Sequence, residues 1–293
     1  SCDIEKRESY SHDEVPSSYY GKEYTAEVLA FPETTEHVSL IMKIASAHNI
    51  PVTPRGAGTG LSGGALPVYG GIVMSFEKMN KILELDEDNL SVTVEPGVVT
   101  AEISRLAESH GLLYAGDPCS GDASYIGGNI AENPGGNKVI KYGATGAQLL
   151  ALEAVLADGS VTWFGGKRRK DVTGFDFVHL MAGSEGMLAI VTKAILKLLP
   201  LPKYSVDLLA AFKDTESAIA FVPRIVTEGG IIPTSVEFMD EKAIKLSERF
   251  LNTPVPAREA GAVLIIQLEE NDCDKLESIY ENIGKLSQKH GAY

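Results

Sequence analysis

The residues most able to do chemistry in this chain lie in a glycine-rich run from Pro54 to Ala65. Five glycines fall within nine residues of it, Arg55 stands near its start, and Thr59 and Ser62 supply hydroxyl groups. Glycine-rich backbone reaches positive φ easily and can turn several N–H groups toward one anion. A flexible surface loop is the alternative, but the arginine and the hydroxyl groups favour phosphate binding.

Two familiar phosphate motifs do not fit this run. Gly58, Gly60 and Gly63 match the dinucleotide pattern G-x-G-x-x-G, but that pattern must open directly into a helix. Here the chain continues as ALPVYGGIVMSF, with Pro67 and two more glycines before a predicted strand. A P-loop fails because no Gly-Lys-Ser or Gly-Lys-Thr follows. We therefore predict a pyrophosphate held by backbone amides between two strands, without a helix dipole.

Two further glycine clusters follow along the chain. Residues 117–136 read DPCSGDASYIGGNIAENPGG, which is polar and too extended for a simple connection. Loops of this kind usually carry function. The third cluster, GSEG at 183–186, lies between HLMA and the strand-like segment MLAIVTKAIL.

Short β-rich runs must position these clusters. Strands are predicted at 25–31, IPVTPRG, GGIVMSF and LSVTVEPG, with helices after Thr34 or Thr35 and from about Ala101 to His110. ALEAVLADGSVTWF reads as two strands joined by a two-residue turn at Asp158-Gly159. AIVTKAILKLLP is predicted as one strand that ends at Pro200.

From Tyr204 onward the elements are longer and glycines are fewer. Strands are predicted at SVDLLAAF, TSVEFMD and GAVLIIQLEE, with helices at DTESAIAFVPRIVTEG, despite Pro223, and at DKLESIYENIGKLSQKHG. This alternation indicates an α+β module of ferredoxin-like kind, which looks cut short at Tyr293.

Composition excludes some partners. The formal net charge is −14, and the only basic cluster is the short run 167–170, so we exclude nucleic acid. The three cysteines, Cys2, Cys119 and Cys273, are too widely spread for a metal knuckle or a disulfide framework. No apolar run approaches the ~18 residues that span a bilayer. We expect a cytoplasmic protein that meets a membrane only through a partner.

The clusters PRGAGTGLSGGA, SYIGGNIAENPGG and GSEGMLAIVTK occur together and in this order. At these residues the chain resembles the FAD-binding domain of the vanillyl-alcohol oxidase/p-cresol methylhydroxylase superfamily, in its branch of glycolate oxidase and D-lactate dehydrogenase. FPETTEHV and SVTVEPGV also look like that family. The resemblance implies an α+β fold, with a two-subdomain FAD-binding domain of the p-cresol methylhydroxylase type followed by a partial ferredoxin-like α+β cap domain. The expected division is a lead-in at 1–23, the FAD-binding domain at 24–202 and a partial substrate or cap domain at 203–293.

The resemblance also implies which residues hold the FAD. In such proteins the first loop grips the pyrophosphate, the IGGN segment lines the isoalloxazine and ribityl side, and the GSEG segment meets the adenosine end. The corresponding residues here are Pro54, Arg55, Gly56, Ala57, Gly58, Thr59, Gly60 and Leu61, then Pro118, Ser124, Gly127, Gly128, Asn129 and Asn133, and finally Glu185, Gly186, Ile190 and Val191.

Departures from the family pattern shape the remaining expectations. The first loop holds no histidine, so we expect the FAD to be bound without a covalent link. Cys119 could supply a thioether link, but we interpret it as a small packing residue near the ring. Phe175 stands where relatives often have tyrosine.

No catalytic residue is named and no metal site is expected in this chain. A histidine-rich motif of some D-2-hydroxy acid dehydrogenases of the branch is absent here, and a catalytic base or a metal site is expected beyond residue 293. No two of the six histidines share metal-ligand spacing, and we interpret His179 as structural; the six are His12, His37, His48, His110, His179 and His290.

Three hypotheses follow from the resemblance. In the first, the chain belongs to an FAD-dependent dehydrogenase or oxidase that oxidises a small D-2-hydroxy acid such as lactate or glycolate, using an arginine for the carboxylate. Its electrons would pass to an acceptor other than NAD, namely a quinone, an iron–sulfur subunit or an electron-transfer flavoprotein. In the second, the same fold acts on another substrate, such as a nucleotide-sugar enoyl ether or an alkylglycerol phosphate. In the third, the chain is a non-catalytic flavin electron-transfer module. The GGNIAEN and GSEG contexts favour the first.

Overall fold

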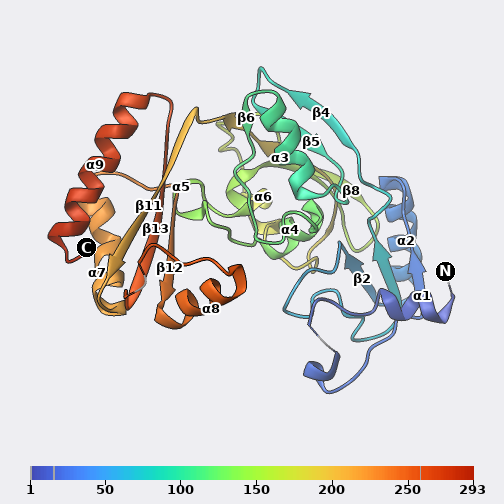
Figure 1. Ribbon diagram of the computed structural model, residues 1–293. Helices are drawn as coiled ribbons and strands as arrows, with labels where there is room; N and C mark the ends of the chain where they lie inside the picture. Colours follow the sequence, from blue (N-terminus) through green and yellow to red (C-terminus); the bar gives the residue numbers. More distant parts are fainter. Residues whose placement is uncertain (1, 16, 258) are drawn as a thin grey trace. The chain divides into compact units, whose positions relative to one another are not determined.

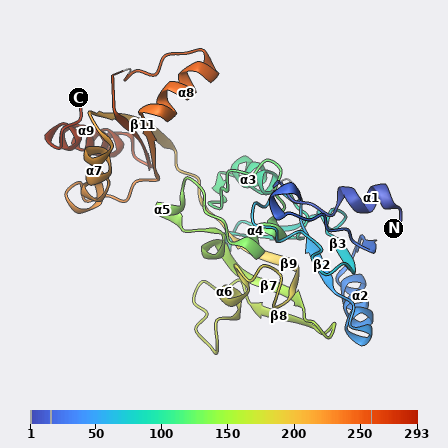
Figure 2. The same ribbon diagram turned by 90° about the horizontal axis from the view of Figure 1, so that it is seen from below.

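The chain divides into two compact units (Figures 1 and 2). A computed structural model describes residues 2–15, 17–257 and 259–293. The first unit comprises Ser1–Gly136 and Ala144–Pro200, and the second comprises Asn137–Gly143 and Leu201–Tyr293. No helix among the described residues is both long enough and apolar enough to cross a membrane.

A small parallel sheet opens the first unit. Its strands run in the order β1 (Val28–Ala30), β3 (Ile72–Ser75), β2 (Val52–Arg55). Helix α2 (Thr35–His48) connects β1 to β2 and begins after Thr34, whose side chain accepts the N–H of His37 at 3.3 Å. Val38 of this helix packs with Met74 and Ile190, so the small sheet shares a core with the larger sheet that follows.

The larger sheet of the first unit is antiparallel, in the order β4-β5-β9-β7-β8. Its strands are β4 (Ile82–Asp86), β5 (Ser91–Val94), β7 (Leu149–Val155), β8 (Val161–Gly165) and β9 (Ile190–Lys197). Three helices supply side chains to the core beside it: α3 (Thr100–Ser109), α4 (Ile126–Glu132) and α6 (Phe177–Met181). Short elements complete the unit: α1 (Ile4–Ser9), 3-10 helices at Ser17–Tyr20 and Thr145–Gln148, and β6 (Leu112–Leu113) paired with β10 (Leu199–Pro200).

The second unit contains an antiparallel sheet in the order β11-β13-β12. Its strands are β11 (Tyr204–Phe212), β12 (Ser235–Asp240) and β13 (Ala262–Glu270), and its longer helices are α7 (Thr215–Thr227), α8 (Glu241–Leu251) and α9 (Cys273–Lys289). Helix α7 links β11 to β12 while β13 lies between them, which is the split β-α-β arrangement of ferredoxin-like modules. Apolar side chains of α7, α9 and the sheet form one buried core.

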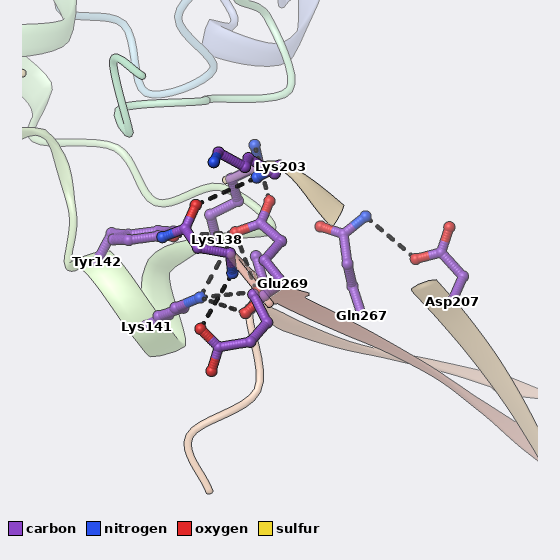
Figure 3. A network of polar contacts seen from close by, with 10 residues as sticks. Lys138, Lys141, Tyr142, Lys203, Asp207, Gln267 and Glu269 are labelled. Atoms are coloured by element: carbon purple, nitrogen blue, oxygen red, sulfur yellow. Dashed lines mark hydrogen bonds and ion pairs between the residues drawn. The ribbon is translucent and has the colours of Figure 1, made fainter. Parts of the chain in front are cut away.

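A buried carboxylate ties the short helix α5 (Val139–Tyr142) to this sheet (Figure 3). Glu269 of β13 has a side chain only 8% exposed and lies 3.7 and 3.6 Å from the ammonium groups of Lys138 and Lys141. The hydroxyl groups of Tyr142 and Thr234 donate to it at 2.9 and 3.2 Å. Burial and the bond to Glu269 raise the pKa of Tyr142. Segment 137–143 thus packs with the second unit although the chain on both sides of it belongs to the first.

Three predictions about elements need correction. The cluster at 117–136 is not one extended loop, because IGGNIAE forms helix α4, with Ile126 and Ile130 buried one turn apart. The hairpin loop is longer than two residues: the N–H of Leu156 bonds the carbonyl of Ser160, and Gly159 takes φ +81°. This geometry matches a three-residue loop that ends in a left-handed glycine.

The third correction concerns the last predicted strand of the first unit. The predicted strand to Pro200 is interrupted at buried Leu198, whose N–H bonds the carbonyl of Leu90. Strand β4 and helix α8 were not predicted. α8 follows β12 directly, with Asp240 both ending the strand and capping the helix, so no turn signal separates them.

Candidate functional site

The three glycine clusters converge on one cavity of about 510 Å³ in the first unit. All the residues predicted from sequence to hold a cofactor line it except Asn133: Pro54, Arg55, Gly56, Ala57, Gly58, Thr59, Gly60, Leu61, Pro118, Ser124, Gly127, Gly128, Asn129, Glu185, Gly186, Ile190 and Val191. Asn133 instead ends α4 with φ 50°, and its side-chain oxygen accepts the N–H of Gly146 at 2.7 Å.

The first cluster connects β2 to β3, and the structure assigns no helix to residues 56–71. Within the described ranges, the backbone N–H groups of residues 56–62 donate to no protein acceptor. Free amides on a glycine-rich loop at a cavity wall suit an anion. This geometry agrees with the predicted loop between two strands.

Arg55 supplies a buried cation beside this loop. The residue is 7% exposed, and its guanidinium donates to the carbonyl of His12 and lies 5.7 Å from the ring centre of Tyr10. Burial lowers the pKa of Arg55, while Tyr10 and Asp13 act to raise it. Gly58, at φ +79°, leaves room for the guanidinium, because an added Cβ would lie 2.1 Å from Nη2.

Helix α4 forms a second wall, and its two adjacent glycines differ in surroundings. A Cβ on Gly127 would lie 2.6 Å from Pro96, whereas a Cβ on Gly128 would meet no atom within 4 Å. Gly56 lies against Gly128, since a Cβ on Gly56 would be 3.6 Å from the Gly128 backbone. The first loop and α4 therefore approach backbone to backbone, and Gly128 leaves the cavity open.

Two predicted site residues on this wall use their side chains internally. The side-chain amide of Asn129 donates to the Thr100 hydroxyl at 2.6 Å, and that hydroxyl lies 3.3 Å from the Ser124 hydroxyl. All three residues are buried. Their bonds hold the start of α4 on α3, so these side chains fix the shape of the wall.

The third cluster closes the cavity from the other side. Glu185 and Gly186 have φ of 52° and 72°, and a Cβ on Gly186 would lie 2.7 Å from Pro54. The N–H of Glu185 bonds the carbonyl of Ala131 at 2.9 Å, which ties the cluster to α4. Burial and the nearby Glu185 raise the pKa of Glu132, which also lines the cavity.

Several lining residues were not predicted. Tyr125, Ala131 and Glu132 fall inside the second motif, so a closer reading of that motif could have found them. Ala189 falls inside the third motif, GSEGMLAIVTK. Other lining residues come from outside the three motifs, and only the fold brings them to the cavity: Phe76, Pro96 and Met181.

Cys119, Phe175 and His179 were also discussed from the sequence, and they lie in different surroundings. Cys119 lines the cavity and is exposed, and its interpretation as a small packing residue near the ring stays a prediction. Phe175 is 86% exposed, and His179 pairs with Asp176, the cap of α6, at 2.8 Å. Among the described residues no group of three or more His, Cys, Asp or Glu is placed to hold a metal ion.

Comparison with known proteins defines the class of this site. The FAD binding domain family model matches residues 26–165, and the model of the FAD linked oxidases, C-terminal domain, matches residues 201–293. The structure of p-cresol methylhydroxylase with substrate bound superposes with a TM-score of 0.78 at 18% identity, covering 99% of this chain and 61% of that one. This match confirms the predicted fold.

Curated relatives are more similar in sequence. Glycolate oxidase subunit GlcD of Bacillus subtilis (strain 168) is 42% identical over 276 residues, which cover 92% of this chain and 57% of the relative. D-lactate dehydrogenase of Anaerostipes hadrus is 37% identical over 293 residues, covering 98% and 61%. The chain thus spans about three fifths of the length of these relatives.

The fold and the cavity together define an FAD-binding protein. More narrowly, the two family matches identify the chain as an FAD-linked oxidase, and its cofactor is FAD. The residues at the cavity fit that cofactor: free amides and a buried arginine suit a pyrophosphate, and an open wall at Gly128 leaves room for a large ligand.

Proposed function

We propose that this chain is the FAD-carrying part of an oxidoreductase that oxidises a small D-2-hydroxy acid, of the lactate or glycolate type, to the 2-oxo acid. The observation that carries the proposal is the identity of 42% and 37% to a glycolate oxidase subunit and a D-lactate dehydrogenase over nearly the whole chain. Both names specify small 2-hydroxy acids.

Each wall of the cavity is assigned one part of the cofactor. The amides of 56–62 and Arg55 bind the pyrophosphate, which supplies the negative charge that those donors need. The wall from Pro118 to Asn129 lies along the isoalloxazine and ribityl groups. At the adenosine end, the carboxylates of Glu132 and Glu185 accept ribose hydroxyl groups. With no histidine in the first loop, the FAD is bound without a covalent link.

Bound FAD supplies the redox chemistry by accepting a hydride equivalent from the carbon that bears the hydroxyl group. The hydroxy acid loses two electrons and two protons in total, and the hydroxyl proton leaves to a base. The chain's own part is to orient the flavin and exclude water at the cavity wall. The electrons then pass to an acceptor other than NAD. The first relative is named as a subunit of an oxidase, and this name supports electron transfer to a partner subunit.

Two further assignments belong to this proposal. Residues 24–202 form the FAD-binding domain and 203–293 the substrate or cap domain, which the family matches at 26–165 and 201–293 support. The protein works in the cytoplasm, a reducing compartment that suits the free thiols of Cys2, Cys119 and Cys273.

An anaerobic visible spectrum of the purified protein tests the proposal. We expect flavin bands near ~450 nm that bleach when D-lactate, glycolate or D-2-hydroxyglutarate is added. Acid precipitation should release the flavin into the supernatant. Flavin bands that persist with all three acids would contradict the substrate class, and flavin that remains in the pellet would contradict non-covalent binding.

A further inference from the structure

The predicted lead-in is packed onto the first glycine cluster. Here the strap denotes residues 10–15, which run from the end of α1 to the FAD loop. Its beginning is fixed to the small sheet: the Ser11 hydroxyl accepts the N–H of Ala26 at 3.0 Å, and the Tyr10 hydroxyl donates to Glu77 at 2.5 Å. Its later part reaches the loop, where the N–H of Glu14 donates to the carbonyl of Gly60 at 3.2 Å.

Asp13 makes the central contact between the strap and the loop. This residue is 5% exposed, and its Oδ2 accepts the N–H of Gly63 at 2.7 Å and the Tyr20 hydroxyl at 3.2 Å. Its Oδ1 accepts the N–H of Val15 at 3.0 Å. Both oxygens are therefore occupied by donors, and one donor belongs to the FAD loop itself.

The same strap also positions the arginine of the site. The carbonyl of His12 accepts the guanidinium of Arg55, and the ring of Tyr10 lies beneath that guanidinium. At the far end of the loop, the ring of Tyr20 packs against Gly63, which has φ +84°. The strap thus holds both ends of the loop and leaves the amides of 56–62 without protein acceptors.

We propose that Asp13 is a positioning residue for FAD binding, which holds the loop in its binding geometry through Gly63. This inference rests on the proposed FAD site. A glycine-rich loop loses much conformational entropy when it is ordered on a ligand. An anchor that orders the loop beforehand removes part of that loss and tightens binding.

Electrostatic repulsion alone predicts that Asp13 weakens FAD binding, which is the opposite of a positioning role. A carboxylate near a pyrophosphate repels it, so neutralising Asp13 would tighten FAD binding if charge dominated. In Asp13→Asn, one oxygen becomes an amide donor that faces Val15 or Gly63, and at least one bond is lost. The positioning role therefore predicts that Asp13→Asn weakens FAD binding, so the two explanations predict changes in Kd of opposite direction.

The test is a titration of the deflavinated protein with FAD, in which the quenching of flavin fluorescence measures binding. We expect Asp13→Asn to raise the Kd by at least about tenfold and Tyr20→Phe by about two- to tenfold, because hydrogen bonds to charged groups are the stronger ones. Glu23→Gln removes the same charge from an exposed position in the lead-in and should leave the Kd unchanged.

A second measurement separates positioning from general stability. The rise in Tm caused by a fixed FAD concentration depends on affinity, so positioning predicts a smaller rise in Asp13→Asn than in the unmodified protein. An unchanged rise with a lower Tm of the apo protein would overturn the proposal, as would an unchanged or lower Kd. If the unmodified protein bound no FAD, the FAD site itself would fail, and this outcome is distinct from the failure of Asp13.

Discussion

Replacing Gly128 by alanine should have opposite effects on the apo protein and on FAD binding. Gly128 lies in the first turn of α4 with no positive φ, and an added Cβ would meet no protein atom within 4 Å. Gly-to-Ala changes at compatible positions stabilise by ~0.4–1 kcal/mol, chiefly because the unfolded chain loses freedom. For a chain of this size that corresponds to a rise in Tm of about 1–4 °C.

The same methyl group would project into space that the proposed cofactor fills. Overpacking by one carbon costs about 1–3 kcal/mol, which corresponds to a Kd raised by about 5- to 150-fold. The assay pairs thermal unfolding of the deflavinated protein with an FAD titration. An unchanged Kd would refute the placement of the flavin against Gly128, and a lower apo Tm would refute the argument from open space.

Gly284→Ala is the matched control. Gly284 lies within α9, and a Cβ there would also meet no atom within 4 Å. It is absent from the cavity lining. This substitution should stabilise the apo protein by a similar amount and leave FAD affinity unchanged, so any loss of affinity in Gly128→Ala belongs to the cavity.

Three other perturbations have expected outcomes. Gly58→Ala should lower the apo Tm, because αL backbone disfavours alanine by about 1–2 kcal/mol and the Cβ would displace the Arg55 guanidinium. The pKa of Glu132 is raised in the folded state, so the ionisation of this carboxyl group destabilises the fold as the pH rises from the usual pKa of 4.5 through the raised value. Glu132→Gln should therefore stabilise the apo protein at pH ~7 but not at a pH below the usual carboxyl pKa, which thermal unfolding scans from acid to neutral pH would measure. Glu269→Gln should destabilise the protein by about 1–3 kcal/mol in urea unfolding, because two lysines lose a buried partner, whereas Glu270→Gln, which loses the Lys275 pair, should cost ~0.5 kcal/mol or less.

Local chemistry made much of the fold and cavity predictable from the sequence. Glycine density and the absence of a following helix were sufficient to predict an anion loop between two strands, and β2 and β3 flank it as expected. The cap of α2 by Thr34 and the helix that contains Pro223 followed from equally local signals. In each case the deciding residues lie within a few positions of one another.

Contacts between distant residues could not be predicted in this way. Asp13 bonds Gly63 across fifty positions, and Lys141 meets Glu269 across 128 positions. Asp13 belongs to no motif, so composition alone assigned residues 1–23 to a polar lead-in. Glu269 falls at the end of the predicted strand GAVLIIQLEE, where no sequence signal marks its carboxylate as buried. Their importance comes from burial, which only the folded chain reveals.

Gly127 and Gly128 show that two identical residues of one sequence motif can be required for different physical reasons. The two glycines are adjacent in the sequence, but Pro96 leaves no room for a side chain at the first, whereas a Cβ on the second would meet no atom within 4 Å. The first glycine therefore serves the packing of the protein, and the second serves the cavity that we assign to FAD. The sequence motif alone does not distinguish these two roles, because both positions are glycine. Since one constraint acts in the apo protein and the other only when a ligand is present, stability and affinity must be measured separately to tell them apart.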